Sequence, residues 1–396
     1  MKTVMILGGN EEKIDMVRGA VRRGYNVVLV DKDKNAPGFS VNGIEKEYLS
    51  IIDNERILEA AQKHKIDGIL TITDKAVRTV AYVASRMGLP GISEEAAFMG
   101  TNKAAMRKRL KERGVPIPQF YAVRSKKEYN SAVSCFHGKF VVKAVDNAGS
   151  LGIYLIKDWQ NRDDIEYAYD YCLKYSSSGE LLLEEYMEGP EICVETLSSD
   201  GVCYPIQITD QKAKEPPYFI DCGYNQPSLL NEETQKKIRE IAIEANMALE
   251  NYQGSSCTEM IVTKDGPKIV ELGLRLAGDY MTSKMVPLST GIDMITAAVQ
   301  IAVGDPIDIT STLQAASCVR YFMKERIGVI KNITGISEAY KTPGIQQVGI
   351  LKNIGDTATE LRGSGDRLGF VITQAQTPEM AIKYAEEAID KIDFIV

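Results

Sequence analysis

The chain has 396 residues, of which 44% are hydrophobic and 26% charged, and its formal net charge is −7. This length predicts two or three domains with sizeable cores, and the acidic balance argues against a nucleic-acid-binding protein, which usually carries a basic excess. No segment approaches the roughly 18 apolar residues of a membrane-spanning helix, and the opening MKTVMILGGN predicts a first β-strand instead of a signal peptide.

Residues 1–92 alternate strand and helix patterns, which predicts a parallel sheet with helices on both faces. The expected strands are Val4–Leu7, Val27–Val30 and Gly68–Thr73. The expected helices are Lys13–Arg23, Asn54–Lys63 and Lys75–Met87, with Asp74 as the cap of the last one. The turn after the first strand, GGNEE, lacks the GxGxxG pattern and puts Glu11 and Glu12 where a pyrophosphate would bind. A structural α/β domain that helps to hold substrate is therefore favoured over a dinucleotide site.

The rest of the chain begins with a basic helix and then becomes rich in strands. The helix Lys103–Arg113 ends at Gly114 and two prolines. The expected strands are Phe140–Val145, Gly152–Ile156, Leu181–Tyr186, Ile192–Leu197 and Val202–Ile208. A long helix (Asn231–Glu250), a hairpin (Cys257–Leu274), a helix at 291–303 and a small α+β tail (318–396) follow.

Cysteine and histidine usage narrows the chemistry. Seven scattered cysteines form no CxxC pair, so we expect reduced thiols in a cytoplasmic protein and no thiolate metal site. Only two histidines exist, His64 and His137, and both are expected at the surface. This disfavours Ser-His, Cys-His and most zinc-dependent mechanisms, and leaves carboxylates, lysines, arginines and a bound metal.

Two glutamates in the hairpin form the strongest local signal. Glu259 lies six residues before Asp265 of the Asp-Gly turn, and Glu271 lies six residues after it. A loop of odd length would place the two glutamates face to face, whereas a two-residue loop would put them on opposite faces. Opposed carboxylates repel, and Mg²⁺ bridging phosphates would reverse that penalty. Gly273 leaves room for a ligand beside Arg275, which could bind a phosphate or carboxylate; the alternative is a solvated hairpin with two surface glutamates.

Three further segments suggest a nucleotide. A strand carries Lys143 into a loop of small residues whose backbone N–H groups could approach phosphates, although an ordinary hairpin explains it equally well. The string LLLEEYMEGPE offers an apolar slot and carboxylates suited to adenine and ribose, or else is an acidic edge strand. Lys103 begins a run of basic residues, most of which we expect to lie on a solvated face: Arg107, Lys108, Arg109, Lys111 and Arg113.

Taken in this order, the motifs resemble the ATP-grasp superfamily over essentially the whole chain. The resemblance implies an α/β and α+β architecture: an N-terminal parallel-sheet (pre-ATP-grasp) domain at 1–100, a two-lobed nucleotide-binding region with a small lobe at 101–178 and a large lobe at 179–310, and a C-terminal α+β domain at 311–396. It implies ATP contacts by Lys103, Lys143, Gly149, Ser150, Gly152, Glu184, Glu185, Tyr186, Met187 and Glu191. It implies a metal site at Glu259 and Glu271, and a catalytic role for Arg275. Apart from the resemblance, Lys212 is a candidate for a further phosphate or carboxylate contact, and a surface loop lysine explains it at least as well.

The phrase ELGLRLAGD is similar to the branch that holds the L-amino acid ligases. The expected activity is ATP- and Mg²⁺-dependent (Mn²⁺ as an alternative) joining of a small carboxylate to an amine through an acyl phosphate. Rivals are a bicarbonate-activating or glycinamide-ribonucleotide-synthetase-like enzyme, and a regulatory protein that binds ATP without turnover. The family often has Asn where this chain has Gly273, so the sequence leaves the number of metals open, along with both substrates. No nucleic-acid or membrane partner is expected, and a homodimer is the default oligomer.

Overall fold

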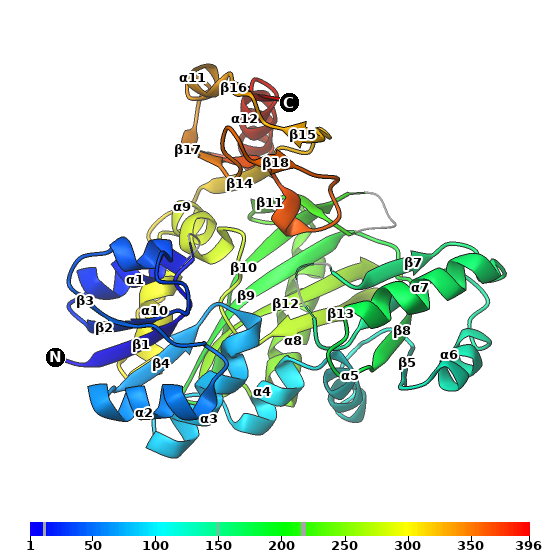
Figure 1. Ribbon diagram of the computed structural model, residues 1–396, viewed down its shortest axis with the longest axis horizontal. Helices are drawn as coiled ribbons and strands as arrows, with labels where there is room; N and C mark the ends of the chain where they lie inside the picture. The colour runs from blue at the N-terminus through cyan, green and yellow to red at the C-terminus, as the bar shows by residue number, and fades with distance from the viewer. Residues whose placement is uncertain (11–12, 148, 150, 215–218) are drawn as a thin grey trace.

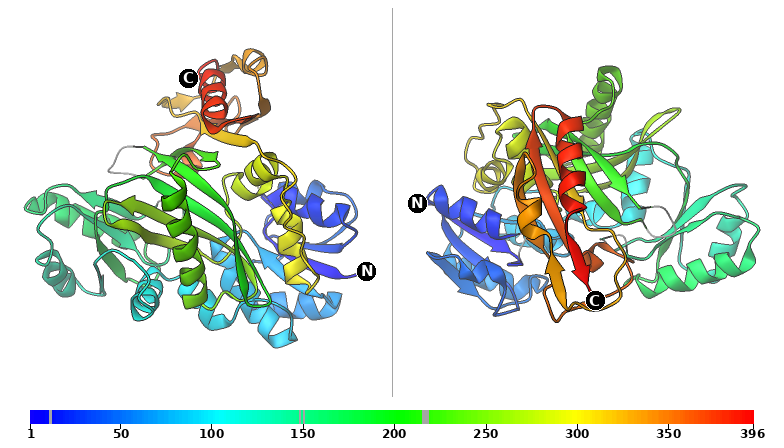
Figure 2. Two further views of the ribbon diagram at one scale, coloured as in Figure 1. Left: turned by 180° about the vertical axis from the view of Figure 1, so that it is seen from behind. Right: turned by 90° about the horizontal axis from the view of Figure 1, so that it is seen from above.

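The computed structural model describes residues 1–10, 13–147, 149, 151–214 and 219–396. Figure 1 shows an N-terminal α/β domain on one side, a small lobe on the other, a long central sheet between them and a C-terminal domain above. The two views in Figure 2 show the same arrangement from behind and from above, with the end of the chain far from its beginning. The expected α/β and α+β architecture is confirmed.

The N-terminal domain is built on a parallel sheet of order β3-β2-β1-β4. Its strands are β1 (Thr3–Leu7), β2 (Asn26–Val30), β3 (Ile44–Glu47) and β4 (Gly68–Thr71). Strand alternation sends Val4 and Ile6 toward α1 (Ile14–Arg22), and Met5 and Leu7 toward α2 (Asn54–His64) and α3 (Val77–Met87). Both faces of the sheet are therefore buried, as parallel sheets require.

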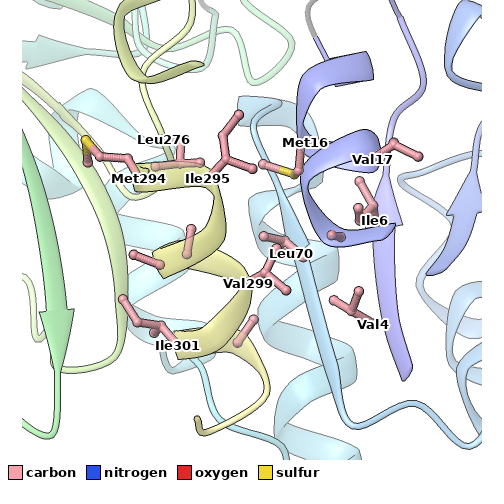
Figure 3. Packing of buried hydrophobic residues seen from close by; sticks show 14 of the residues in the cluster. Val4, Ile6, Met16, Val17, Leu70, Leu276, Met294, Ile295, Val299 and Ile301 are labelled. Carbon is pink, nitrogen blue, oxygen red and sulfur yellow. The ribbon is translucent and has the colours of Figure 1, made fainter. Parts of the chain in front are cut away.

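A helix from much later in the chain completes this domain. Helix α10 (Met294–Ala302) packs against α1 and β4, and Figure 3 shows Ile295 and Val299 directed toward the side of Met16 and Leu70. Met294 and Val299 are fully buried, and each such side chain contributes about 1.5–3 kcal/mol by leaving water. The large lobe is thereby fixed to the N-terminal sheet.

The small lobe holds an antiparallel sheet of order β5-β8-β6-β7. Its strands are β5 (Phe120–Val123), β6 (Phe140–Ala144), β7 (Ile153–Ile156) and β8 (Leu181–Glu185). Helices α6 (Lys126–Val133) and α7 (Arg162–Lys174) pack with Phe140 and Val142 of β6 on one face. Alternation leaves Val141 and Lys143 on the opposite face.

The central sheet has eight strands in the order β13-β12-β9-β10-β11-β14-β19-β17, all antiparallel. They are β9 (Glu191–Ser199), β10 (Val202–Ala213), β11 (Asp221–Gln226), β12 (Gly254–Thr263), β13 (Gly266–Gly273), β14 (Ala316–Tyr321), β17 (Ile345–Ile350) and β19 (Gly369–Ala375). The last three follow residue 310, so the C-terminal domain continues the sheet of the large lobe. Helices α8 (Glu232–Ala248) and α12 (Pro378–Ile389) cover parts of it.

The remaining elements are short. The helices are α4 (Glu94–Gly100), α5 (Lys103–Glu112), α9 (Val286–Thr290) and α11 (Ile336–Ala339). The 3₁₀-helices are η2 (Pro37–Ser40), η3 (Asp74–Ala76) and η5 (Ser364–Asp366), and η4 (Met281–Met285) is a π-helix. The strands are β15 (Gly328–Val329), β16 (Asn332–Thr334), β18 (Thr357–Ala358) and β20 (Asp393–Ile395).

Membrane-spanning character is weak throughout the described residues. None of their single helices is long and apolar enough to cross a bilayer. One pair of helices, Met281–Thr290 and Met294–Ala302, reaches that length and apolar composition when taken together, but the two are bent by 119° relative to each other.

Candidate active site

A cavity of about 480 Å³ lies where the N-terminal domain, the small lobe and the central sheet meet. Its size falls in the range of small-molecule sites, roughly 300–1,000 Å³. Most of the residues singled out in the sequence line it: Lys103, Lys143, Gly149, Glu184, Glu185, Tyr186, Met187, Glu191, Glu259, Glu271 and Arg275. These residues, up to 172 positions apart in the chain, are thus brought together around one cavity.

Glu259 and Glu271 face each other because of a β-bulge. The turn is a two-residue loop closed by the Thr263–Gly266 pair, which alone would put the two glutamates on opposite faces. Between Met260 and Glu259 the register shifts, so that β13 contains one extra residue, Val270, and Glu259 becomes the direct partner of Glu271. Of the two loop lengths that the sequence left open, the two-residue loop is present, and the bulge still makes the two glutamates face each other.

The two glutamates differ in their surroundings. Burial, and next the carboxylate of Glu271, raise the pKa of Glu259 well above its usual range. Glu271 accepts a hydrogen bond of 2.8 Å from the ammonium of Lys103, which also donates to the carbonyl of Asn147. Lys103 therefore donates to one of the two carboxylates, and its charge and that of Arg275 act on Glu259 as well. A divalent cation between the two carboxylates would favour the ionised form of both.

Arg275 is held by the N-terminal domain. Its guanidinium donates two hydrogen bonds, of 2.8 and 2.9 Å, to the carboxylate of Asp74. Asp74 was expected to cap a helix through its side chain; instead that side chain binds Arg275, and α3 begins only at Val77. Burial raises the pKa of Asp74, but Arg275 more than offsets this and holds it below its usual range.

Gly273 lies directly beside the Asp74–Arg275 pair. A Cβ at this position would lie 3.5 Å from the Arg275 guanidinium carbon and 3.6 Å from Oδ1 of Asp74. An asparagine side chain, which the family often has here, would extend further toward the same two groups. A side chain longer than a methyl group at position 273 would therefore compete with the ion pair for the same space.

Glu184 holds two cations at the base of the small lobe. Arg107 donates to one of its oxygens, and the ammonium of Lys143 lies 2.7 Å from the other. Burial raises the pKa of Glu184, but Arg107 and Lys143 outweigh it and bring it down to about 2. Arg107 was grouped with a basic run expected to be largely solvated; it is 1% exposed, because it lies one helical turn after Lys103 on the same inward face. It also donates to the carbonyl of the bulge residue Val270.

The segment after β8 forms one wall of the cavity. Glu185 is paired with Lys268 at 2.8 Å, while Tyr186 and Met187 line the space beside it. Glu191 begins β9 opposite Ile261, so an apolar side chain lies next to a carboxylate. Burial, followed by the charge of Asp221, raises the pKa of Glu191.

The loop between β6 and β7 closes the cavity on another side. The carboxylate of Asp146 accepts from the backbone of Ser177 and Ser178, which fixes the base of the loop. Gly149 and Gly152 have φ values of +71° and +73°, a left-handed conformation that favours glycine. Gly149 lines the cavity, whereas Gly152 forms the turn back into β7. Ser150 lies outside the described residues.

Lys212 is not brought into this group. On β10 its neighbour Gln211 lines the cavity, so alternation directs Lys212 to the other side of the sheet. There its ammonium lies 3.1 Å from Glu386 of α12, and the side chain is 57% exposed. A phosphate contact from this lysine is not supported.

An acidic end of the cavity was missed in the sequence. Asp221 and Asp279 line it with Tyr224, whose hydroxyl donates to Asp279 at 2.9 Å. Arg367, from the C-terminal domain, lies 2.8 Å from Asp279 and 3.5 Å from Asp221. Burial, and then the charge of Asp279, raise the pKa of Asp221 despite this arginine. Arg367 belongs to the sequence GDRLG at 365–369, which does not indicate where the arginine side chain would reach.

Comparison with known proteins agrees with this organisation. Three family models match consecutive segments: an ATP-grasp N-terminal domain over residues 17–91, an ATP-grasp domain over 100–279, and L-amino acid ligase C-terminal domain 2 over 320–396. An L-arginine-specific L-amino acid ligase of Bacillus subtilis is 25% identical over 322 residues, which cover 78% of this chain and 75% of that protein. A phosphoribosylamine–glycine ligase of Pyrococcus furiosus is 25% identical over 98% of this chain and 91% of its own length.

Solved structures share the whole fold. An L-amino acid ligase from Bacillus licheniformis superimposes with a TM-score of 0.87 at 21% identity, covering 100% of this chain and 98% of that one. A phosphoribosylglycinamide synthetase from Anaerococcus prevotii gives 0.79 at 19% identity, with 100% and 99% covered. With its fold, its cavity and all three family matches in agreement, the chain belongs to the ATP-grasp superfamily of carboxylate–amine ligases.

Proposed function

We propose that this protein uses ATP to join a small carboxylate to an amine, and that the carboxylate is an amino acid. The observation that carries the proposal is the opposed Glu259–Glu271 pair, with Lys103 and Arg275 beside it in one cavity. Two opposed carboxylates fit a divalent cation. Mg²⁺, or Mn²⁺, bound there would supply positive charge to the phosphates of ATP.

The nucleotide is proposed to lie between the two lobes. The wall from Glu185 to Met187 would receive the adenine, and Glu191 the ribose. Lys103 and Lys143 would face the phosphates, with the Gly149 loop over them. Both ammonium groups are already held in place by carboxylates, so little side-chain order has to be gained on binding.

The reaction then follows in two steps. A carboxylate oxygen of the substrate attacks the γ-phosphorus of ATP, the bond to the bridging oxygen breaks, and ADP leaves an acyl phosphate behind. The amine nitrogen attacks the acyl carbon, phosphate departs, and an amide forms with loss of a proton. Arg275, oriented by Asp74, would stabilise charge on the phosphoryl group, and closure by the glycine loop would keep water from the acyl phosphate.

An amino acid is favoured by the acidic end of the cavity. Asp221 and Asp279 lie there with the guanidinium of Arg367 as the cation paired with both, among the described residues. An ammonium group would find opposite charge in that region, whereas bicarbonate would not. The match of residues 320–396 to the L-amino acid ligase C-terminal domain 2 supports the same class.

The test is ADP release measured with Mg²⁺ over the twenty amino acids, singly and in pairs, with bicarbonate as a separate arm. The proposal expects ADP only when a carboxylate donor and an amine are both present, together with a dipeptide or amide in the products. ADP release with bicarbonate alone would favour the bicarbonate-activating alternative. Tight ATP binding without ADP over the whole panel would favour a regulatory role.

A further inference from the structure

Two cysteines lie beside Glu259 on the cavity-facing side of the central sheet. Cys193 on β9 is the direct partner of Glu259 on β12, so their side chains share one face. Cys257 precedes Glu259 by two residues on the same strand and therefore points to that face as well. The two sulfur atoms and a carboxylate oxygen of Glu259 all lie within 4.8 Å of one another.

This set of atoms has the chemistry of a soft-metal site. Zinc binds sulfur at about 2.3 Å and carboxylate oxygen at about 2.0–2.2 Å, so tetrahedral ligand atoms are roughly 3.5–4 Å apart. The three ligand atoms lie within 4.8 Å of one another, so binding requires them to move closer together by about 1 Å at most. Mg²⁺ prefers oxygen ligands in octahedral geometry and gains nothing from the two sulfurs. The cluster therefore distinguishes thiophilic cations from magnesium.

The site is reachable from the cavity and incomplete without a further ligand. Cys257 and Glu259 line the cavity, while Cys193 is buried behind them and donates from Sγ to Oε1 of Gln211 at 3.3 Å. Three protein ligands leave the fourth position of a tetrahedral ion for water or another group from the cavity. The cysteines are 64 residues apart, which is why their spacing in the sequence gave no sign of a site.

We propose that Cys193, Cys257 and Glu259 form an inhibitory site for a thiophilic divalent cation such as Zn²⁺. An ion bound there takes Glu259 away from Glu271, so the pair no longer holds Mg²⁺ under the phosphates. The binding itself needs only the three side chains. The inhibition rests on the proposed function.

Metal binding is tested on the full chain, reduced and freed of metal, without nucleotide. Cd²⁺ alone is titrated in, and the ultraviolet charge-transfer absorption of cadmium–thiolate bonds is recorded. The expected result is one equivalent bound in wild type and at least tenfold weaker binding in both Cys193→Ser and Cys257→Ser. Cys318→Ser is the matched control, since Cys318 is buried in β14 of the same sheet, and it should bind like wild type.

Two outcomes of the titration overturn the site: wild type that shows no thiolate absorption, or serine variants that bind as tightly as wild type. A thermal melt of each variant shows whether it is folded, and Cys193→Ala provides a second replacement if the serine fails to fold. Because no turnover is measured, a negative result here leaves the ligase assignment untouched.

Inhibition is tested separately with Zn²⁺ in a metal buffer. Wild-type ADP release should be blocked by Zn²⁺, restored by chelator and protected by raised Mg²⁺. Cys193→Ser should need at least ten times more Zn²⁺ for the same block. Equal sensitivity of the two proteins contradicts the inhibitory role. Absence of ADP release from untreated wild type contradicts the ligase proposal instead, and the cadmium titration still decides the site.

Discussion

Arg367 of the C-terminal domain and Asp279 of the cavity wall form an ion pair of 2.8 Å, and Arg367 is only 2% exposed. Asp279 and Tyr280 both have left-handed φ values, +53° and +64°, which residues other than glycine adopt at a cost of about 1–3 kcal/mol. The ion pair and the Tyr224 hydrogen bond hold this turn in place. The C-terminal domain therefore fixes the position of Asp279, at the end of the segment 271–280 that begins with Glu271.

Replacing Arg367 by Met should leave Asp221 and Asp279 without their guanidinium. Removing one partner of a buried ion pair costs about 3–5 kcal/mol, so we expect a clear fall in the thermal midpoint and a loss of ADP release. Arg367→Lys should restore part of both. The control is Arg362→Met, because Arg362 pairs with Glu360 at the surface of the same domain and should shift stability by no more than about 0.5 kcal/mol. Equal thermal midpoints for the Arg367→Met and Arg362→Met variants would contradict a stabilising role of the Arg367–Asp279 ion pair.

Arg275→Met should reduce turnover while leaving the protein folded. If its guanidinium stabilises charge on the phosphoryl group, kcat should fall by roughly 10²–10³, with a much smaller change in the KM for ATP. Asp74→Asn should lower kcat less, since the guanidinium remains but loses its charged partner. Asp53→Asn, at the cap of α2 in the same domain, serves as the control. A wild-type kcat in Arg275→Met would remove Arg275 from the mechanism.

Glu184→Gln should destabilise the small lobe in a pH-dependent manner. The variant leaves Arg107 and Lys143 buried around a neutral group, at a cost of about 3–5 kcal/mol near pH 7. The pKa of Glu184 falls from 4.5 to about 2 on folding, so its stabilising effect is complete above pH 4.5 and is lost as the pH falls toward 2. Thermal midpoints of wild type and variant should therefore converge in acid. A gap that stays constant from pH 6 to pH 3 would show that the ionised carboxylate is not its cause.

Periodicity and motif order in the sequence predicted many of the elements and most of the residues that line the cavity. They did not predict β5, α6, α7 or β11. The sequence could not supply the register of the hairpin, which depends on one bulge residue, Val270, whose carbonyl accepts from Arg107. The sequence also did not show that Lys212 points away from the cavity. Whether Gln211 or Lys212 faces the cavity depends on which face of β10 is turned toward it. Strand alternation alone does not decide that.

The sequence also could not predict the ion pairs that connect different domains. Asp74 lies 201 residues before Arg275, and Arg367 lies 88 residues after Asp279. Each pair forms only because the N-terminal and C-terminal domains pack around the segment that follows β13. Local patterns in the sequence do not specify such packing.

The most direct measurement is Mg²⁺-dependent ADP release by Glu271→Gln, beside Glu240→Gln on the exposed side of α8 as a control. If Glu271 and Glu259 hold the metal under the phosphates, Glu271→Gln keeps a cooperative thermal transition but loses turnover by at least about a hundredfold, and added Mg²⁺ does not restore the wild-type rate. A folded Glu271→Gln protein that releases ADP at the wild-type rate, with the wild-type Mg²⁺ dependence, would contradict the account.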